Sequence, residues 1–373
     1  MISIKEVQSK RDLKAFVRFP MVLYKNSPYY VPPILKEEME VLQPETNPVF
    51  RNASAHFFLA YKRNKIVGRI AVIINRIEVK ELNKPKIRFG WFDVIDDLDV
   101  TKALLGKVEE IGRNNGLSYM EGPVGFSNMD KAGLLVKGFD ELNTMITLYN
   151  HPYYEKHFLT LGFEPQATWV EYRIKVPEAT RKKVRKFAKI VKERYNLHLI
   201  RFKNTKQILP YVDQMFDLLN KTYSTLQTFV PIQQYQINHY KEKYIPYIHP
   251  DYITCIADEN GKLIAFSIVM PSFSKALKRM DGKMYPFGFL HLLRAQKRNN
   301  VAAFYLIGID PEYQNKGVTA IIFEEMNETF LRNGIEVVET NPELEENKAI
   351  QALWSDYDHE QHKKRRTYRK SLD

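Results

Sequence analysis

The chain has 373 residues, 44% of them apolar, and its net charge at pH 7 is +12. This length exceeds what one hydrophobic core usually fills, so we expect two domains, and the apolar content excludes a disordered chain. The longest uncharged apolar run, Val301–Ile309, is too short for a bilayer-spanning helix, the N-terminus has no signal-like segment, and the single cysteine, Cys255, excludes an internal disulfide. We therefore expect a cytoplasmic protein without a transmembrane segment.

Positive charge is concentrated in three segments. Residues 181–194 carry eight basic residues and one acidic residue, residues 272–300 carry seven and one, and residues 363–370 carry six and none. Such a run is either a solvated face or a surface that attracts a polyanionic substrate, a cofactor or a membrane.

The first recognisable elements belong to a sequence repeat, in which segments of the first half align with segments of the second. Ala60–Ile73 aligns without a gap with Ala257–Met270, at an offset of 197 residues, and both predict a strand, a polar hairpin turn and a second strand. Val100–Glu121 aligns with Val318–Glu339 at an offset of 218, and both predict a helix, an Asn-Gly stop suited to a left-handed C-cap, and a strand. A period of about 200 residues indicates a duplicated α/β domain, because solenoid repeats are far shorter.

Two segments lie outside the repeat. Residues 176–196 contain apolar side chains at helical spacing (Val184, Phe187, Ala188 and Val191), so we expect a packed connector helix with a basic outer face. The difference between the two offsets places 21 additional residues in the second half, and we expect them in the basic segment 272–300.

The stretch Ile309–Met326 predicts the end of an apolar strand, a polar turn with one glycine, and a helix. A turn that opens a helix gathers backbone N–H groups, and the helix dipole adds positive potential, so anions bind there readily. Gln314 and Asn315 add hydrogen-bond donors, Lys316 adds charge, and Gly317 permits a positive φ. A plain strand-to-helix connection has the same pattern, so the residues alone leave both interpretations open.

Residues Ile307 to Thr319 resemble the central motif of the GNAT superfamily of acyl-CoA-dependent N-acyltransferases. In that motif a strand ending in hydrophobic-x-Pro-x-Tyr meets a Gln/Arg-x-x-Gly-x-Gly/Ala loop, and the helix, strand and asparagine that follow occur here in the same order. The resemblance implies an α/β (α+β) fold with two tandem GNAT-like domains, each a mixed, mostly antiparallel, splayed central sheet flanked by helices. We expect these domains at residues 1–175 and 197–373, joined by the connector 176–196.

The resemblance also implies a cofactor, acetyl-CoA or another acyl-CoA. The residues it places at the pyrophosphate are Gln314, Asn315, Lys316, Gly317, Val318 and Thr319, and those it places at the pantetheine are Ile307, Ile309 and Asn347. Two positions depart from the family pattern. Thr319 stands where the family has glycine or alanine, and Trp354 where it has the tyrosine that protonates the leaving thiolate. Because indole is too weak an acid for that step, we expect Tyr357 to replace it, with a merely packed tyrosine as the alternative.

The first half resembles the same family near its end, at Pro152–Lys156 and Leu161–Phe163. Its counterpart of the loop, however, contains three carboxylates, Asp96, Asp97 and Asp99, which would repel a pyrophosphate. We therefore expect a degenerate cofactor loop in the first half and the cofactor site in the second. Motifs such as Glu121-Gly122-Pro123 further resemble large tandem GNAT-like bacterial proteins of uncharacterised substrate.

Acyl transfer to an amine also needs a base. Glu339, at the end of the strand after the helix, is the candidate, although its counterpart Glu121 leaves an inherited structural role open. The insert from Tyr285 onward predicts either a lid over the acceptor site or an amphipathic helix at a membrane surface. The lid is favoured because the insert precedes the strand expected to pair with pantetheine.

The resemblance thus implies an acyltransferase that moves an acetyl or longer acyl group from acyl-CoA to a small-molecule or peptide amine. Two alternatives remain. One is a tRNA-dependent aminoacyl transferase, since such enzymes also use tandem modules and the surface is basic, although no nucleic-acid-binding motif is present. The other is a catalytically silent protein that keeps the fold and binds CoA or another ligand.

Overall fold

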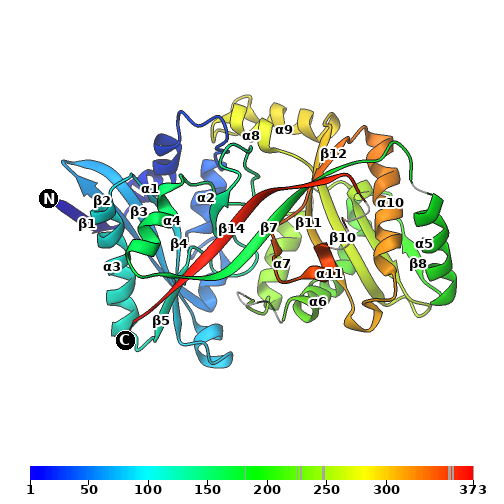
Figure 1. Cartoon of the computed structure of the whole chain (residues 1–373), viewed down its shortest axis with the longest axis horizontal. Helices are drawn as coiled ribbons and strands as arrows, with labels where there is room; N and C mark the ends of the chain where they lie inside the picture. Colours follow the sequence, from blue (N-terminus) through cyan, green and yellow to red (C-terminus); the bar gives the residue numbers. More distant parts are fainter. Residues whose placement is uncertain are drawn as a thin grey trace.

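The computed structural model of the chain describes residues 1–180, 182–224, 226, 229–245, 248–351, 354 and 357–372, and only the backbone of residues 349 and 350. One continuous sheet runs along the molecule, with helices on both of its faces (Figure 1). Within the described residues this sheet has fourteen strands. The structure confirms the expected α/β class with a mostly antiparallel, mixed sheet.

The strands are β1 (Ile2–Glu6), β2 (Ala53–Lys62), β3 (Lys65–Asn75), β4 (Lys86–Val94), β5 (Tyr119–Gly122), β6 (Leu134–Lys137), β7 (Glu164–Lys175), β8 (His198–Ile200), β9 (Ile253–Ala257), β10 (Leu263–Pro271), β11 (Val301–Ile309), β12 (Val337–Glu339), β13 (Glu343–Leu344) and β14 (His359–Ser371). The helices are α1 (Lys10–Leu23), α2 (Leu35–Val41), α3 (Leu98–Asn114), α4 (Tyr153–Thr160), α5 (Lys182–Arg194), α6 (Val212–Tyr223), α7 (Gln234–Lys243), α8 (Ser274–Met280), α9 (Gly288–Lys297), α10 (Val318–Asn333) and α11 (Lys348–Gln351).

The two halves share one plan, as the repeat predicts. β2–β3 and β9–β10 are the two expected antiparallel hairpins. In each half a helix then connects two parallel strands, β4–α3–β5 in the first and β11–α10–β12 in the second. The two Asn-Gly stops place Gly116 at φ 65° and Gly334 at φ 69°, in the left-handed region that glycine adopts without strain.

The sequence pattern did not predict how the halves join. The last strand of the chain, β14, lies between β5 and β7 of the first half, with Tyr368 opposite Gly122 and Lys364 opposite Val170. β7 in turn pairs with β12 of the second half, Ile174 opposite Val338. Each half therefore has its last strand hydrogen-bonded to a strand of the other half (Figure 1).

The position of β14 also corrects the interpretation of the basic run 363–370. Most of that run is neither a solvated face nor an anion-binding patch, because Lys363 and Arg365 are completely buried and Arg369 alone of its six basic residues is exposed. Arg365 Nε lies 2.5 Å from a carboxylate oxygen of Glu171 on β7. Three partly buried residues of the run also form ion pairs, at 2.7–2.9 Å: Lys364 with Glu345, Arg366 with Glu155 and Lys370 with Glu109.

Each half has apolar cores on both faces of the sheet. In the first half α3 and α4 pack on one face through residues such as Leu104 and Phe158, and α1 packs on the other through Phe16. In the second half α10 and α5 cover one face through Ile321 and Ala188. α6 and α7 cover the opposite face through residues such as Leu218 and Ile237.

α5 lies within the segment 176–196, and it packs along α10. Ala188 and Val191 are buried, and Lys192 and Arg185 form ion pairs with Glu324 and Glu328 of α10 at 2.7 and 3.0 Å. Phe187 departs from the expectation, since half of its side chain is exposed.

The additional residues of the second half form α8 and α9 between β10 and β11, as expected. α8 rests on the first half: Lys278 Nζ donates to the carbonyl oxygen of Ser27 at 3.2 Å, and the N–H of Leu35 donates to the carbonyl of Gly282 at 3.1 Å. No helix within the described residues is long and apolar enough to cross a membrane.

Candidate functional site

The second half opens where its two parallel strands separate. β11 pairs with β12 only from Ala303 opposite Glu339 back to Val301 opposite Val337, while β13 pairs with β7 instead. Just beyond this point the register of β10 with β11 shifts, which leaves Tyr305 without a partner on β10. A bulge of this kind releases backbone groups from the ladder, and bulges are frequent beside active sites.

The predicted loop lies at the far end of β11. Its six residues begin after the short helical turn Pro311–Tyr313, and Gln314, Asn315 and Lys316 are exposed. Asn315 and Gly317 have φ values of 60° and 79°, so the positive φ expected of Gly317 is confirmed. Lys316 Nζ lies over the rings of Tyr313 and Tyr195, 5.1 and 5.3 Å from their centroids. Gly317 is the N-cap of α10, and the first-turn N–H groups of Val318 and Thr319 have no intrahelical acceptor.

Gly317 is required for a second reason, which the sequence did not indicate. A Cβ atom at this position would lie 2.7 Å from the ring of Phe187 and 3.1 Å from Val191, both on α5. The loop is therefore backed by α5, which fixes its position against α10.

The loop of the first half has the opposite character. Asp97 is the N-cap of α3, and its carboxylate accepts hydrogen bonds from the N–H groups of Asp99 at 3.1 Å and Val100 at 3.4 Å. Lys62 lies 2.7 Å from the same carboxylate, and these contacts hold the pKa of Asp97 below its usual value. The carboxylate already occupies the place that an anion would take.

Two backbone carbonyls near the end of β11 accept hydrogen bonds from side chains of the second half. Tyr223 of α6 donates its hydroxyl to the carbonyl of Ile307 at 3.2 Å, and Gln314 donates its amide to the carbonyl of Ile309 at 3.1 Å. Burial raises the pKa of Tyr223 to about 12. Asn347 is exposed and immediately precedes α11, in the order that the resemblance implies.

Glu339 faces the side of the sheet that carries α6. Its neighbour Val338 packs into the α10 core, and alternation along the strand turns Glu339 to the opposite face. Burial raises the pKa of Glu339, and this rise is partly offset by Lys363, whose Nζ lies 3.7 Å from the carboxylate, and by Arg173. The side-chain amide of Asn341, two residues after Glu339, donates a hydrogen bond to the backbone carbonyl of Tyr305.

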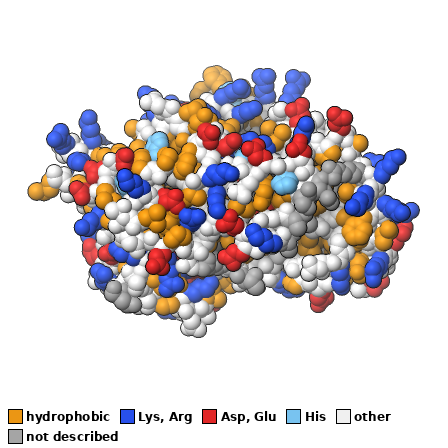
Figure 2. Space-filling view, viewed as in Figure 1, with side chains coloured by type: hydrophobic (Ala, Val, Ile, Leu, Met, Phe, Trp, Pro, Cys, Tyr) orange, Lys and Arg blue, Asp and Glu red, His pale blue; other side chains and the backbone are white. Residues whose placement is uncertain are grey.

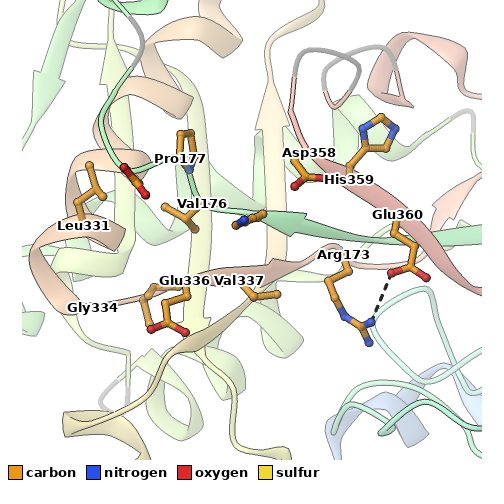
Figure 3. A pocket seen from close by; sticks show the side chains of 13 residues that line it. Arg173, Val176, Pro177, Leu331, Gly334, Glu336, Val337, Asp358, His359 and Glu360 are labelled. Atoms are coloured by element: carbon orange, nitrogen blue, oxygen red, sulfur yellow. Dashed lines mark ion pairs between the residues drawn. The ribbon is translucent and has the colours of Figure 1, made fainter.

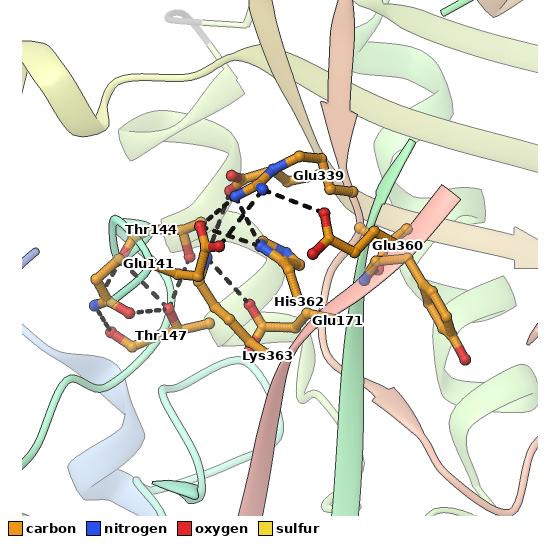
Figure 4. A network of polar contacts seen from close by, with 12 residues as sticks. Glu141, Thr144, Thr147, Glu171, Glu339, Glu360, His362 and Lys363 are labelled. Atoms are coloured by element: carbon orange, nitrogen blue, oxygen red, sulfur yellow. Dashed lines mark hydrogen bonds and ion pairs between the residues drawn. The ribbon is translucent and has the colours of Figure 1, made fainter. Parts of the chain in front are cut away.

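A buried polar network continues from Glu339 into β14 and β7 (Figure 4). Lys363 Nζ has no hydrogen-bond partner within the described residues, and its two carboxylate neighbours, Glu339 and Glu171, are 3.7 and 3.9 Å away. His362 Nε2 is likewise buried and unpartnered among these residues, and burial together with the neighbouring Lys363 and Arg173 lowers the pKa of His362 to about 2. Buried polar atoms without partners call for an explanation such as an unseen water or a ligand.

Trp354 and Tyr357 lie on the other face, against α10. Trp354 is buried between Phe304 and Phe323, with ring centroids 5.7 and 5.2 Å away. Tyr357 packs edge-on against Phe323 at 6.3 Å. The structure therefore places the two expected catalytic residues, Glu339 and Tyr357, on opposite faces of the sheet.

Glu343 is a further titratable group that the sequence did not single out. It receives the indole N–H of Trp354, and burial raises its pKa to about 7. Glu343 lies in residues 341–347, whose polar sequence predicts a loop. Its burial depends on contacts with Trp354 and β7, so no local sequence signal marks its raised pKa.

Two cavities differ in their relation to these residues. One of about 610 Å³ is lined by Arg173, Glu336, Val337, His359 and neighbouring residues (Figure 3). It adjoins Gly334 at the C-terminal end of α10, and the helix length of roughly 24 Å separates it from the loop at Gly317. The other, of about 370 Å³, lies beside Asp96 and His157 in the first half. No group of three metal-ligating side chains occurs among the described residues.

The sequence matches no protein-family model. It is 27% identical over 379 aligned residues to Protein YghO of Escherichia coli, covering 99% of this chain and 95% of that protein. It is 23% identical over 382 residues to the bacterial ceramide synthase of Caulobacter vibrioides, covering 100% of this chain and 98% of that protein.

A solved structure resembles the whole chain. A tandem GNAT protein from the clavulanic acid biosynthesis pathway superposes with a TM-score of 0.60 at 11% identity, covering 100% of this chain and 99% of that one. A GCN5-related N-acetyltransferase from Sphaerobacter thermophilus gives a TM-score of 0.55 at 9% identity, with 100% and 96% coverage. These likenesses show that the chain has the tandem GNAT fold.

Proposed function

We propose that this chain, which has the tandem GNAT fold, transfers an acyl group from acyl-CoA to an amine at a site in its second half. The contrast between the two copies of one loop carries this proposal. In the first copy Asp97 caps its helix, whereas in the second the N-cap is Gly317 and the exposed Lys316 stands beside it. A pyrophosphate would be repelled by the first copy and attracted by the second.

The acyl-CoA substrate would extend from this loop along β11. The seven residues from Ile309 back to Ala303 span roughly 20 Å, which leads from the loop to Glu339. In our proposal the pantetheine pairs with the backbone of Ile307 and Ile309, where the Tyr223 and Gln314 contacts would be exchanged, and Asn347 flanks it. The thioester carbonyl would lie at the bulge, where the N–H of Tyr305 can polarise it.

We assign Glu339 as the general base and Tyr357 as the general acid. The amine nitrogen attacks the thioester carbonyl and its proton passes to Glu339, which lies on the α6 face. The C–S bond then breaks, and the thiolate takes a proton from Tyr357 on the α10 face. The products are the amide and free CoA. The positions of these groups on opposite faces suit an acceptor and a leaving group that lie on opposite sides of the thioester.

Small-molecule and peptide amines both fit the assignment. The Caulobacter relative is named a ceramide synthase, and a ceramide is the amide of a long-chain amino alcohol. Long-chain amino alcohols with long-chain acyl-CoA therefore belong in the first substrate panel, beside acetyl-CoA with short amines.

Calorimetric titration with CoA tests the cofactor site. Thr319→Glu places a carboxylate in the first turn of α10, where it favours the helix but repels pyrophosphate, so we expect CoA affinity to fall at least tenfold with the melting temperature retained. Lys65→Glu adds a carboxylate at an exposed hairpin tip and is the matched control. Gly317→Glu is a poorer test because it would also collide with Phe187. Equal CoA affinity in the wild type and Thr319→Glu would contradict the assignment.

Release of free thiol, followed with the amine panel, tests turnover. We expect Glu339→Gln to bind CoA normally and to release thiol at least a hundredfold more slowly than the wild type. Titration with tRNA at several salt concentrations distinguishes the aminoacyl transferase, which would bind tRNA in a strongly salt-dependent way and not need CoA. CoA binding without thiol release from any acyl-CoA and amine pair would leave a catalytically silent binding protein.

A further inference from the structure

α9 carries large apolar side chains on its outer surface. None of its residues is buried, although its sequence is GFLHLLRAQK. The exposed fractions are 36% for Phe289, 49% for Leu290 and 48% for Leu293, and those of Tyr285 and Phe287 just before the helix are 77% and 70%. Together these five side chains form what we call the α9 surface. The rings of Tyr285 and Phe289 lie 6.2 Å apart, and exposed apolar side chains that cluster in this way mark a site of interaction with a protein or a membrane.

The α9 surface is bordered by positive charge. Six basic residues of the insert are exposed: Lys275, Arg279, Lys283, Arg294, Lys297 and Arg298. Asp281 is the one acidic residue of the segment 272–300. None of the six lies within 4.0 Å of a carboxylate in the part of the chain that the structure describes. In Figure 2 apolar side chains and projecting Lys and Arg side chains gather along the upper edge, where α8 and α9 lie in Figure 1.

The other basic helix of the chain differs in this respect. On α5, Arg185 and Lys192 pair with carboxylates of α10, and Lys189 lies 3.8 Å from Glu193 one turn later. Positive charge on α5 is therefore partly neutralised within the protein, whereas that around α9 is not. Uncompensated basic residues beside exposed Leu and Phe are the pattern of a helix that lies in the headgroup region of an anionic bilayer.

We propose that the α9 surface docks on anionic lipid bilayers. The charge favours this occupant over a second copy of the chain, because two such surfaces face to face would bring twelve uncompensated cations together. The docking does not depend on the proposed enzymatic activity.

The placement of α9 shows which part of the molecule would then face the bilayer. Leu292 on its inner side and Leu142 of the first half pack around the same small core. Glu141, next to Leu142, forms an ion pair with Arg173, and Arg173 belongs to the network around Glu339. Docking through α9 would therefore turn the edge of the molecule that carries α8, α9 and Leu142 toward the membrane (Figure 1).

Co-sedimentation of the full-length protein with lipid vesicles tests this proposal. We expect binding to vesicles of equal parts phosphatidylglycerol and phosphatidylcholine, much weaker binding to phosphatidylcholine alone, and a loss of binding as salt is raised. Arg294→Gln with Lys297→Gln is expected to lower the partition coefficient roughly twentyfold to thirtyfold, since each basic residue near the surface contributes roughly fivefold. Leu290→Gln with Leu293→Gln is expected to lower it at least tenfold.

Two matched controls separate docking from unfolding and from net charge. Arg63→Gln with Lys65→Gln removes the same charge at the exposed tip of the β2–β3 hairpin, and Leu159→Gln removes a half-exposed leucine of α4. Both should bind vesicles like the wild type, and all variants should keep its melting temperature. Loss of binding on changing Lys186 and Lys189 of α5, with the α9 variants unaffected, would overturn the proposal. So would a dimer that Leu290→Gln dissociates while the wild type ignores vesicles.

Discussion

Trp354 donates its indole N–H to both carboxylate oxygens of Glu343, at 3.0 and 3.1 Å, and both side chains are buried. Trp354 stands where the family resemblance places the acidic tyrosine. The second half therefore holds a carboxyl group with a near-neutral pKa close to the place where a phenol was expected.

Glu343→Gln should remove a pH-dependent loss of stability. Burial raises the pKa of Glu343 from its usual 4.5 to about 7, so the folded state binds its proton more tightly than the unfolded state. The resulting stability is fully present below about pH 4.5 and is lost as the pH rises through about 7, by about 3 kcal/mol. Urea unfolding of both proteins across this range measures the difference. Parallel curves for wild type and variant would show that Glu343 ionises normally.

Trp354→Phe should move that transition to higher pH. The indole hydrogen bond lowers the pKa of Glu343, so its removal leaves burial less opposed. We also expect a cost of about 1–3 kcal/mol for the lost hydrogen bond. Phe323→Leu, which disturbs the same ring cluster but keeps the indole donor, is the control. A shift that is equally large in the control would assign the effect to packing.

Residues 1–175, which we propose as a domain, should not fold alone. In the whole chain β14 is hydrogen-bonded between β5 and β7, so the fragment leaves those two strands without their shared neighbour. Fusing residues 359–371 to the fragment through a flexible linker should restore a cooperative urea transition, monitored by circular dichroism. A cooperative transition in the bare fragment would show that β14 is dispensable for this half.

Arg173→Met should shift the acidic limb of the pH profile of kcat/KM to higher pH, if Glu339 is the base. Arg173 and Lys363 oppose the effect of burial on the pKa of Glu339, whereas Glu171 and Glu141 add to it. Glu141→Gln should therefore move the same limb to lower pH. Lys175→Met, at an exposed position two residues along the strand, is the control. If neither Arg173→Met nor Glu141→Gln moves the limb, Glu339 is not the titrating base.

Much of each half could be predicted because its signals are local. Hairpins, crossover helices and glycine stops such as Gly334 depend on residues close together in the chain. The loop at Gly317 was found in the same way, and comparing it with Asp97 needed only the repeat. The assigned roles of these residues at an acyl-CoA remain predictions.

The strand exchange could not be predicted in this way. Residues 363–370 read as a charged surface run, and the carboxylate that neutralises Arg365 is Glu171, almost two hundred residues earlier. The same holds for Phe187, whose contact with Gly317 depends on how α5 packs across α10. Tertiary contacts between distant segments decide such features, and a single sequence records them only as isolated residues.

The place of β14 also sets an order of events during synthesis. The first half leaves the ribosome before the second, yet the neighbour that β5 and β7 share is encoded in residues 359–371. Until β14 is made, those strands present open edges, and open edges invite pairing with other chains. Substitutions that weaken the pairing of β14 are therefore expected to leave open edges in the half that was built first, far from the changed residue in the sequence.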